Sequence, residues 1–395
     1  MHNSQKLLDA FSALYPQVKE IEQTFCPYRA CPLGAHVDHQ YGLITGFAID
    51  KGIHIAFVPT DNGVVEVSSL NFEGKKQFHV RDIPKPKGDW ADYLRGAAWA
   101  LMKKKHLERG IYAVIEGTLP IGGLSSSAAV IIAFLAALCR ANEVRLSKSE
   151  LISLALEAEH DYVGVNVGKL DQSCEIYSRK NHLLYLDTKD DSYELIPQSP
   201  DMKPYDIAVF FSGMQRTLVG SAFNMRVDEV RAAAYALLGY AGLPYGKFGD
   251  THMRDVPRDV YDTYKDRLPE NWRKRAEHFF TEFERVQRGA DFWRKGDIEG
   301  FGQCVFESGA SSINNYETGS PELKAIYEAM RTCRGVYGGR FSGAGFKGCC
   351  IALIDPNYRE EIAEKVTKEY LAQFPQYEGL FDVFFTHSAD GCVTD

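Results

Sequence analysis

The chain has 395 residues, of which 45% are hydrophobic and 25% are charged, as in globular proteins with a sizeable core and two or three domains. The 45 Lys and Arg residues against 53 Asp and Glu residues give a formal net charge of −8. That balance excludes a basic field favouring nucleic acid or anionic membranes, although one pocket on an acidic protein can still bind an anionic small molecule.

Targeting and redox signals are weak. The longest apolar run, from Ala128 to Cys139, is shorter than the ~20 residues that span a bilayer. The first residues show no charged region leading into an apolar stretch, so we expect no signal peptide. The nine cysteines form no CxxC pair, and an odd number is a poor disulfide framework. We therefore expect small buried thiols in a reducing cytoplasm.

The first half of the chain alternates strands with two helices. Runs rich in β-branched residues predict strands over residues 52–58, 64–68 and 111–116. A helix is expected from about 125–127 to Cys139, and it is apolar on every side, which predicts a central helix that is fully buried. The next helix begins with a capping box, Ser147 with Glu150 three residues on, and continues to about Val163.

The second half contains more helix. Prolines between residues 191 and 206 predict a junction, and we expect domains over 1–200 and 201–395. Residues 241–270 are polar with scattered Pro and Gly, and are expected to form a loop with little regular structure. The other expected elements are a strand at 206–212, helices at 223–239, 272–296, 299–312 and 321–334, a strand at 349–354, a helix at 358–373 and a strand at 381–386. This order predicts an α+β fold.

The strongest functional signal is a glycine pair with three serines, between a predicted strand and the buried helix. The segment comprises Gly122, Gly123, Leu124, Ser125, Ser126 and Ser127. Glycines let the backbone approach a ligand closely, and first-turn N–H groups lack intrahelical partners and carry the positive end of the helix dipole. The segment therefore predicts a phosphate-binding loop whose hydroxyls can bind Mg²⁺. The alternative is a turn followed by a capped helix.

A second glycine-rich run lies near the C-terminus. Gly343 to Gly348 matches GxGxxG, but a predicted strand follows it, whereas a dinucleotide fingerprint requires a helix. The chain also has no HRD or DFG sequence of a protein kinase. We expect a loop between strands, either a plain hairpin turn or the wall of a ligand site.

Two polar segments are further candidates. Residues 27–42 hold Arg29, His36, Asp38 and His39 between prolines and glycines, which fits a surface turn or a functional loop. With no third ligand, the two histidines do not support a metal site.

In residues 158–172, Glu159 lies at the edge of an apolar helix face and Asp171 follows two glycines on a tight loop. A carboxylate at such an edge can be an ion-pair partner or a cation ligand.

These segments, in this order and spacing, resemble the galactokinase branch of the GHMP small-molecule kinases. Three family signatures are present, as Pro-Leu-Gly-Ala-His-Val-Asp-His, Gly-Gly-Leu-Ser-Ser-Ser-Ala-Ala and Gly-Arg-Phe-Ser-Gly-Ala-Gly-Phe-Lys-Gly. The resemblance extends from about Phe25 to near the C-terminus. It implies an N-terminal ribosomal-S5-like mixed α/β domain, a C-terminal ferredoxin-like α+β domain and an active site between them.

The resemblance also implies phosphorylation of an anomeric sugar hydroxyl, with ATP as co-substrate and Mg²⁺ as cofactor. Asp171 would accept the proton, and Arg29 beside it would stabilise charge on the moving phosphoryl group. Ser127 and Glu159 match the Mg²⁺ ligands, and residues 122–127 match the triphosphate loop. The sugar-contacting positions correspond to His36, Asp38 and Gly168.

One departure from the family bears on the substrate. Galactokinases have Gly-Glu-His where this chain has Gly34-Ala35-His36, and that glutamate accepts a hydrogen bond from the sugar C6 hydroxyl. Ala35 cannot, which costs galactose roughly 0.5–3 kcal/mol. A C6 carboxylate would instead escape a like-charge repulsion of about 4 kcal/mol, for charges ~4 Å apart at an effective dielectric of ~20. We therefore expect D-galacturonic acid as the substrate.

Other departures are smaller. Lys347 replaces a glycine of the third signature, and its charge can meet the uronate, meet a nucleotide phosphate or face solvent. Galacturonokinases of plants are similar at both Ala35 and Lys347. Phe223 stands where galactokinases have a sugar-contacting tyrosine, and the second signature is one residue shorter between Pro120 and Gly123.

Several alternatives stay open. The chain fits a galactokinase or an arabinose-type sugar 1-kinase, and less well a kinase for mevalonate, homoserine or another non-sugar alcohol. A non-catalytic sugar sensor is a further alternative, against which the intact Arg29, Glu159 and Asp171 argue. We expect a cytoplasmic protein whose partners are a sugar acid and ATP, with no nucleic-acid or membrane partner, and the sequence leaves the oligomeric state open.

Overall fold

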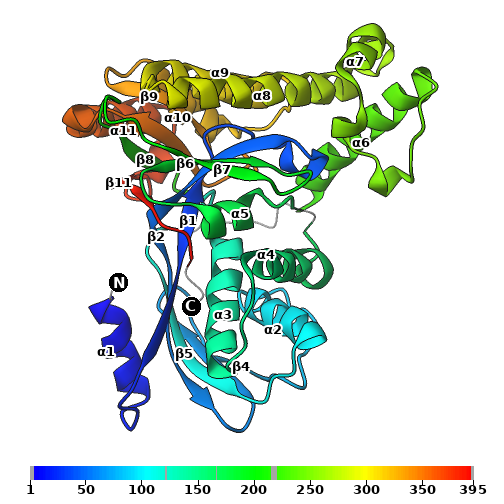
Figure 1. Cartoon of the computed structure of the whole chain (residues 1–395). Helices are drawn as coiled ribbons and strands as arrows, with labels where there is room; N and C mark the ends of the chain where they lie inside the picture. Colours follow the sequence, from blue (N-terminus) through cyan, green and yellow to red (C-terminus); the bar gives the residue numbers. More distant parts are fainter. Residues whose placement is uncertain (1–3, 121, 166, 215–219, 393–395) are drawn as a thin grey trace.

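The computed structural model describes residues 4–120, 122–165, 167–214 and 220–392, and Figure 1 follows the chain from end to end. Its first half is built around the long strand β2 (Leu43–Thr60), which pairs with β1, β5, β6 and β12. The sheet has the order β4-β3-β5-β2-β6-β7, with β1 and β12 also joined to β2. Its other strands are β1 (Glu22–Ala30), β3 (Val64–Ser69), β4 (Lys76–His79), β5 (Gly110–Gly117), β6 (His182–Asp187), β7 (Tyr193–Pro197) and β12 (Ser388–Ala389).

Helices cover both faces of this sheet. On one face α3 packs on β1, β2 and β5, with α2 and α4 outside it. On the other face α1 packs through Leu7 and Phe11 onto Ala56 and Val114. The helices of this half are α1 (Gln5–Leu14), α2 (Asp92–Lys104), α3 (Ser126–Ala141), α4 (Lys148–Glu157) and α5 (Leu170–Tyr177).

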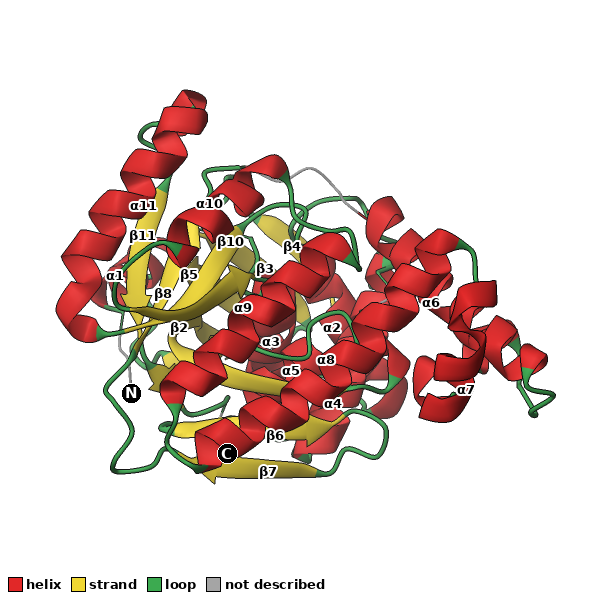
Figure 2. Ribbon diagram, turned by 90° about the horizontal axis from the view of Figure 1, so that it is seen from above, coloured by secondary structure: helices red, strands yellow, loops and turns green. Residues whose placement is uncertain are grey.

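The second half has its own sheet. Four antiparallel strands lie in the order β11-β8-β10-β9, so the chain runs strand, helices, strand, strand, helix, strand, as in a ferredoxin-like unit. The strands are β8 (Asp206–Phe211), β9 (Val336–Phe341), β10 (Cys349–Ile354) and β11 (Asp382–Thr386). The helices are α6 (Gly220–Tyr240), α7 (Arg258–Tyr264), α8 (Glu270–Arg294), α9 (Ile298–Asn314), α10 (Pro321–Arg331) and α11 (Arg359–Gln373). Figure 2 shows α8 and α9 side by side.

Most predicted elements are confirmed. The three strands of the first half correspond to parts of β2, β3 and β5. Nearly every residue of α3 beyond its first turn is buried, as its apolar surface predicts. The capping box of α4 is present, with the Ser147 side chain accepting from the Glu150 N–H and the Glu150 carboxylate accepting from the Ser147 N–H. The α+β fold is the one expected.

One prediction about residues 241–270 is wrong. That segment contains α7 and three short 3₁₀ turns, Phe248–Asp250, Met253–Asp255 and Lys265–Arg267. The helix α7 is only 7 residues long and begins directly after Pro257. Such a short helix carries too few periodic apolar positions to stand out among prolines and glycines.

The boundary between the two predicted domains follows the sheets only in part. The chain leaves the first sheet after β7 and enters the second at β8, so residue 200 lies between them. However, β12 returns to the first sheet, where Ser388 pairs with Ile49. We therefore propose that a boundary near residue 200 holds for all but the last few described residues.

Two further observations concern the whole fold. In the described parts of the chain, no helix combines the length and apolar character needed to cross a bilayer. All nine cysteines lie within the described residues and all are buried, as expected for small core side chains.

Candidate active site

An arginine–aspartate pair lies where the two halves of the chain meet. Arg29 is in β1 next to a break in the pairing of β1 with β2, between Pro27 and Arg29, and such irregularities redirect a side chain. Its Nε lies 2.8 Å from the Oδ1 of Asp171. Asp171 is in the first turn of α5. The other seven residues of this helix are buried, whereas the Asp171 side chain is 23% exposed. The pair therefore faces an accessible space.

The same guanidinium ties three segments together. The Nη1 of Arg29 donates to the Gly123 carbonyl at 2.8 Å and to the Ser342 Oγ at 3.0 Å. Burial acts to lower the pKa of Arg29, but the Asp171 carboxylate outweighs it and the pKa is raised. Arg29 is thus a fixed positive charge at the junction of α5, the loop before α3 and the end of β9.

The segment predicted as a phosphate loop leads directly into the start of α3. Ser125 is the N-cap with a left-handed backbone (φ +60°), and its side chain does not cap the helix. Its Oγ is buried and has no hydrogen-bond partner in the described part of the chain. Because first-turn N–H groups have no intrahelical acceptor, they remain available, together with this hydroxyl, to an anion.

The glycine-rich turn between β9 and β10 closes one side of this loop. A Cβ on Gly122 would lie 2.9 Å from the Gly348 Cα, and a Cβ on Gly343 would lie 3.1 Å from the Gly123 Cα. The two glycine-rich segments therefore touch backbone to backbone, which only residues without side chains allow. Lys347 precedes Gly348 and so belongs to the turn beside the phosphate loop, where it is partly buried.

Three of the residues predicted to bind the sugar, Ala35, His36 and Asp38, lie in the connection from β1 to β2. Ala35 and His36 are buried, and the His36 ring stacks on Tyr316 with 4.5 Å between centroids and an interplanar angle of 9°. Burial, and then the nearby positive charge of Arg340, hold the pKa of His36 well below its ordinary value. The Nε2 of His36 is buried without a partner among the described residues, so a neutral imidazole offers one unused hydrogen-bonding atom.

Asp38 and Gly168 are in direct contact. The Oδ2 of Asp38 accepts from the Leu170 N–H at 3.1 Å, and a Cβ on Gly168 would lie 2.0 Å from that same oxygen. Gly168 therefore lets the chain that leads into Asp171 pass against Asp38. The structure brings Asp38, Gly168, Asp171 and Arg29 together, as the resemblance implies.

The titration of Asp38 gives a pH-dependent prediction. Burial and the neighbouring Asp171 carboxylate raise the pKa of Asp38 to about 6 from an ordinary value of 3.8, although backbone N–H groups oppose the rise. A carboxyl with a raised folded-state pKa binds its proton more tightly when folded, so the folded state loses stability as pH rises from about 4 to about 6. We expect Asp38→Asn to raise the Tm by roughly 2–4 °C at about pH 7.5, and by less at about pH 5.

Thermal unfolding of both proteins at the two pH values checks this prediction. Asp161→Asn is the matched control because Asp161 is exposed, and it should change the Tm little at either pH. A Tm gain for Asp38→Asn that is equal at both pH values would show that Asp38 is not protonated preferentially in the folded protein.

The predicted Mg²⁺ ligands are oxygen donors from two elements of the first half of the chain. Ser127 is in the first turn of α3, and Glu159 is buried in a π-helical turn (Ala158–Val163) that extends α4. Glu159 accepts a hydrogen bond from the Nε2 of Gln172, the residue after Asp171. The other amide atom of Gln172, Oε1, is buried without a partner among the described residues.

This donor set fits Mg²⁺. The ion prefers hard oxygen ligands and is commonly held by one or two protein oxygens, with phosphate oxygens and water completing its shell. The described residues contain no group of three or more His, Cys, Asp or Glu side chains that could hold a metal alone. Ser127 and Glu159 therefore suit a cation that is shared with a nucleotide.

Several residues of the site carry no sequence signal. Tyr316 stacks on His36, and its hydroxyl lies 3.1 Å from the His39 Nε2. His278 and Glu282 of α8 hydrogen-bond the backbone of the segment that contains Ala35. They are separated from that segment by more than 200 residues, and none belongs to a recognisable motif, so only the fold brings them to the site.

A glycine-rich helix start suited to phosphate, an Arg–Asp pair that is partly open to solvent and hard oxygen donors together fit a small-molecule phosphotransferase that uses a nucleotide. Residues 92–179 match the model of the GHMP kinases N-terminal domain, and residues 290–372 match that of the GHMP kinases C-terminal domain. The chain belongs to the galactokinase branch of the GHMP kinases.

The relatives agree over nearly the whole chain. A galacturonokinase of Arabidopsis thaliana is 39% identical over 380 residues, which covers 91% of this chain and 89% of that protein. A galactokinase of Thermococcus kodakarensis is 31% identical and covers 91% and 97%. The crystal structure of Lactococcus lactis galactokinase complexed with galactose superimposes with a TM-score of 0.89 at 26% identity, covering 98% of each chain.

Proposed function

We propose that this protein is an ATP- and Mg²⁺-dependent kinase that phosphorylates the anomeric hydroxyl of D-galacturonic acid, giving galacturonate 1-phosphate. The coarser statement, a sugar 1-kinase, follows from its membership of the galactokinase branch and from its similarity to a galacturonokinase and several galactokinases. We also propose that it acts in the cytoplasm. The observation that carries the choice of substrate is the alanine at position 35.

In the proposed reaction the sugar C1 hydroxyl gives its proton to Asp171 as its oxygen attacks the γ-phosphorus of ATP, and ADP leaves. Phosphoryl transfer depends on positioning and charge stabilisation more than on covalent chemistry. Arg29, 2.8 Å from Asp171 and bonded to the Gly123 carbonyl, can orient the base and stabilise negative charge on the transferring group.

Ser127 and Glu159 would hold the magnesium ion. When bound, Mg²⁺ would supply positive charge that neutralises the phosphate groups of the nucleotide. The N–H groups at the start of α3 and the Ser125 hydroxyl would take the phosphate oxygens that face the protein. Lys347 precedes Gly348, whose backbone lies against Gly122, and this position favours its phosphate-binding alternative over contact with the uronate.

The charge around Ala35 supports an acidic sugar. A glutamate at this position would face a C6 carboxylate, and the repulsion of about 4 kcal/mol corresponds to roughly a thousandfold in affinity. Glu282, a buried carboxylate that accepts from the Gly34 N–H, has its charge compensated by Arg285 at 2.9 Å and Arg340 at 3.8 Å. The negative charge that α8 places beside this segment is therefore compensated.

The proposal is tested by measuring kcat/KM for D-galacturonate, D-glucuronate, D-galactose and L-arabinose side by side. We expect galacturonate to exceed galactose by at least about tenfold. Galactose exceeding galacturonate by about tenfold would end the uronate assignment and leave a galactokinase. L-arabinose as the best acceptor would support the pentose alternative, because a pentopyranose also needs no partner at C6.

The non-sugar and non-catalytic alternatives have their own outcomes in that assay. Turnover of mevalonate or homoserine in place of every sugar would contradict a sugar 1-kinase. A sugar sensor would bind ATP and sugar without turnover. The intact Arg29–Asp171 pair and the buried Glu159 favour catalysis, because binding alone does not require a base.

A further inference from the structure

We propose that His278 and Glu282 of α8 are positioning residues that fix the backbone of Gly34, Ala35 and His36, and so determine how tightly the sugar binds. The inference rests on the proposed function only in taking this segment as part of the acceptor site. It adds that the acceptor site is built across the two halves of the chain, with a helix of the second half holding a loop of the first.

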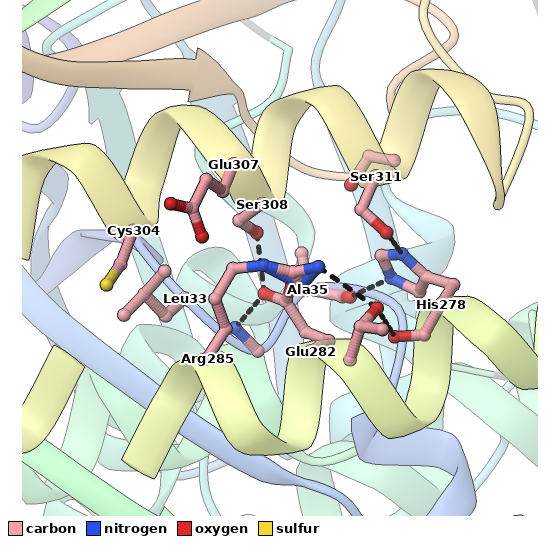
Figure 3. A network of polar contacts seen from close by, with 12 residues as sticks. Leu33, Ala35, His278, Glu282, Arg285, Cys304, Glu307, Ser308 and Ser311 are labelled. Atoms are coloured by element: carbon pink, nitrogen blue, oxygen red, sulfur yellow. Dashed lines mark hydrogen bonds and ion pairs between the residues drawn. The ribbon is translucent and has the colours of Figure 1, made fainter. Parts of the chain in front are cut away.

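Two hydrogen bonds make this connection. The Gly34 N–H donates to the Glu282 Oε1 at 2.7 Å, and the Ala35 carbonyl accepts from the His278 Nε2 at 3.0 Å. Figure 3 shows both side chains pointing from α8 towards the Ala35 segment. His278 and Glu282 are fully buried, so these bonds do not compete with water.

The segment needs such support because the backbone of one of its residues, His36, is strained. Gly34 has φ +92° and His36 has φ +65°, and a non-glycine residue in this region persists only where its surroundings enforce it. The backbone hydrogen bonds within the loop lie on either side of residues 34–36. The Thr45 N–H donates to the Leu33 carbonyl, and the Gln40 N–H donates to the Val37 carbonyl. The Gly34 N–H and the Ala35 carbonyl are bonded by α8 instead.

The histidine can hold only one orientation. Its Nδ1 lies 3.0 Å from the Ser311 Oγ, and a carbonyl can only accept, so Nε2 carries the proton and Nδ1 accepts from Ser311. Burial lowers the pKa of His278 to about 4, although the Glu282 charge opposes this. The imidazole is therefore neutral near pH 7, and its donor to Ala35 is fixed by a second hydrogen bond on α9.

The Glu282 carboxylate is also held in place by hydrogen-bonding and charged partners. Burial acts to raise the pKa of Glu282, but the charges of Arg285 and Arg340 and the hydrogen bond from Ser308 outweigh it and the pKa is lowered. Ser308 donates to the Glu282 Oε1 at 2.6 Å, and Arg285 lies 2.9 Å from the Oε2. A buried polar group with all partners in place is rigid, so the Gly34 peptide has little freedom.

The test is a kinetic comparison of His278→Leu with His278→Gln, using whichever sugar the unmodified protein phosphorylates best. Leucine removes the donor to Ala35, whereas the glutamine amide can restore it. We expect His278→Leu to raise the KM for the sugar at least about tenfold while changing the KM for ATP less than about twofold. His278→Gln should recover most of the sugar KM, to within about threefold of the unmodified protein.

Two further variants complete the design. Glu284→Gln is the control, because Glu284 lies on the same helix, is exposed and pairs only with Arg258 among the described residues, and it should leave both KM values unchanged. If His278→Leu does not fold, Ser311→Ala removes the hydrogen bond that orients His278, and it should raise the sugar KM about threefold with the ATP KM unchanged.

Equal effects on the two KM values, or no recovery with glutamine, would show that His278 is a general structural residue and would overturn the inference. A protein that phosphorylates no sugar would instead contradict the proposed function, so the two failures can be distinguished.

Discussion

Asp171→Asn is expected to lower kcat by about a thousandfold or more, because a general base typically contributes 10²–10⁴-fold and an amide cannot accept the proton. The substitution keeps the shape of the side chain, and an amide oxygen can still accept from the Arg29 Nε, now 2.8 Å from Oδ1. We therefore expect the KM for ATP and the binding of a non-hydrolysable ATP analogue to change little. Steady-state kinetics and calorimetric binding measure the two effects separately.

Asp187→Asn is the matched control for this experiment. Asp187 also forms an ion pair with an arginine, Arg254, at 2.7 Å and is also mostly buried, but it lies outside the site. It should retain kcat within about twofold of the unmodified protein. If Asp171→Asn keeps more than about a tenth of kcat, Asp171 is not the base.

Ala35→Glu is expected to lower kcat/KM for galacturonate by about a hundredfold to a thousandfold. The reason is the repulsion of about 4 kcal/mol between two carboxylates ~4 Å apart at an effective dielectric of ~20. The same substitution restores an acceptor for a C6 hydroxyl, so kcat/KM for galactose should rise. The ratio of the two kcat/KM values is the quantity to measure.

Ala35→Gln separates charge from size in this prediction. Glutamine has nearly the volume of glutamate without its charge, so it should lower galacturonate kcat/KM by no more than about tenfold. Equal losses with Glu and Gln would mean that crowding, not repulsion, causes the effect. An unchanged galacturonate-to-galactose ratio in Ala35→Glu would mean that position 35 does not face C6.

Local patterns in the sequence predict the elements whose signal is strong and short-ranged. The all-apolar run of α3 predicts its burial, and Ser147 with Glu150 predicts the start of α4. The helix α7 is not predicted because it is short and has too few periodic apolar positions. The last turn of α4 is π-helical rather than α-helical, a change of one residue per turn that hydrophobic periodicity does not resolve.

The residues of the candidate site also fall into two groups, those that a local sequence pattern predicts and those that it does not. Some site residues can be recognised because they belong to motifs that are continuous in the chain. These are the glycines and serines at the helix start, and Arg29, Asp38, Glu159 and Asp171. The contacts that join them depend on strand register and helix packing. The bond from Arg29 to the Ser342 Oγ, for example, joins residues 313 apart.

Supporting residues are hidden for a further reason. Glu282, Arg285 and Arg340 look like ordinary charges on a helix and a strand, and a buried charged network is favourable only when its partners are complete. The sequence shows that these residues are charged but not which of them form ion pairs. The hydrogen bonds from α8 to the segment around Ala35 can therefore be recognised only in the folded chain.

A crystal structure with galacturonate and a non-hydrolysable ATP analogue gives the most direct test of the central claim, that the small side chain at position 35 admits an acidic sugar. The quantity to measure is the distance from the sugar's C6 carboxylate to the Ala35 Cβ. We predict van der Waals contact, with the nearest carboxylate atom about 4 Å from that carbon. A galacturonate bound with its carboxylate directed away from Ala35 would contradict the substrate assignment, even if its C1 hydroxyl lay beside Asp171.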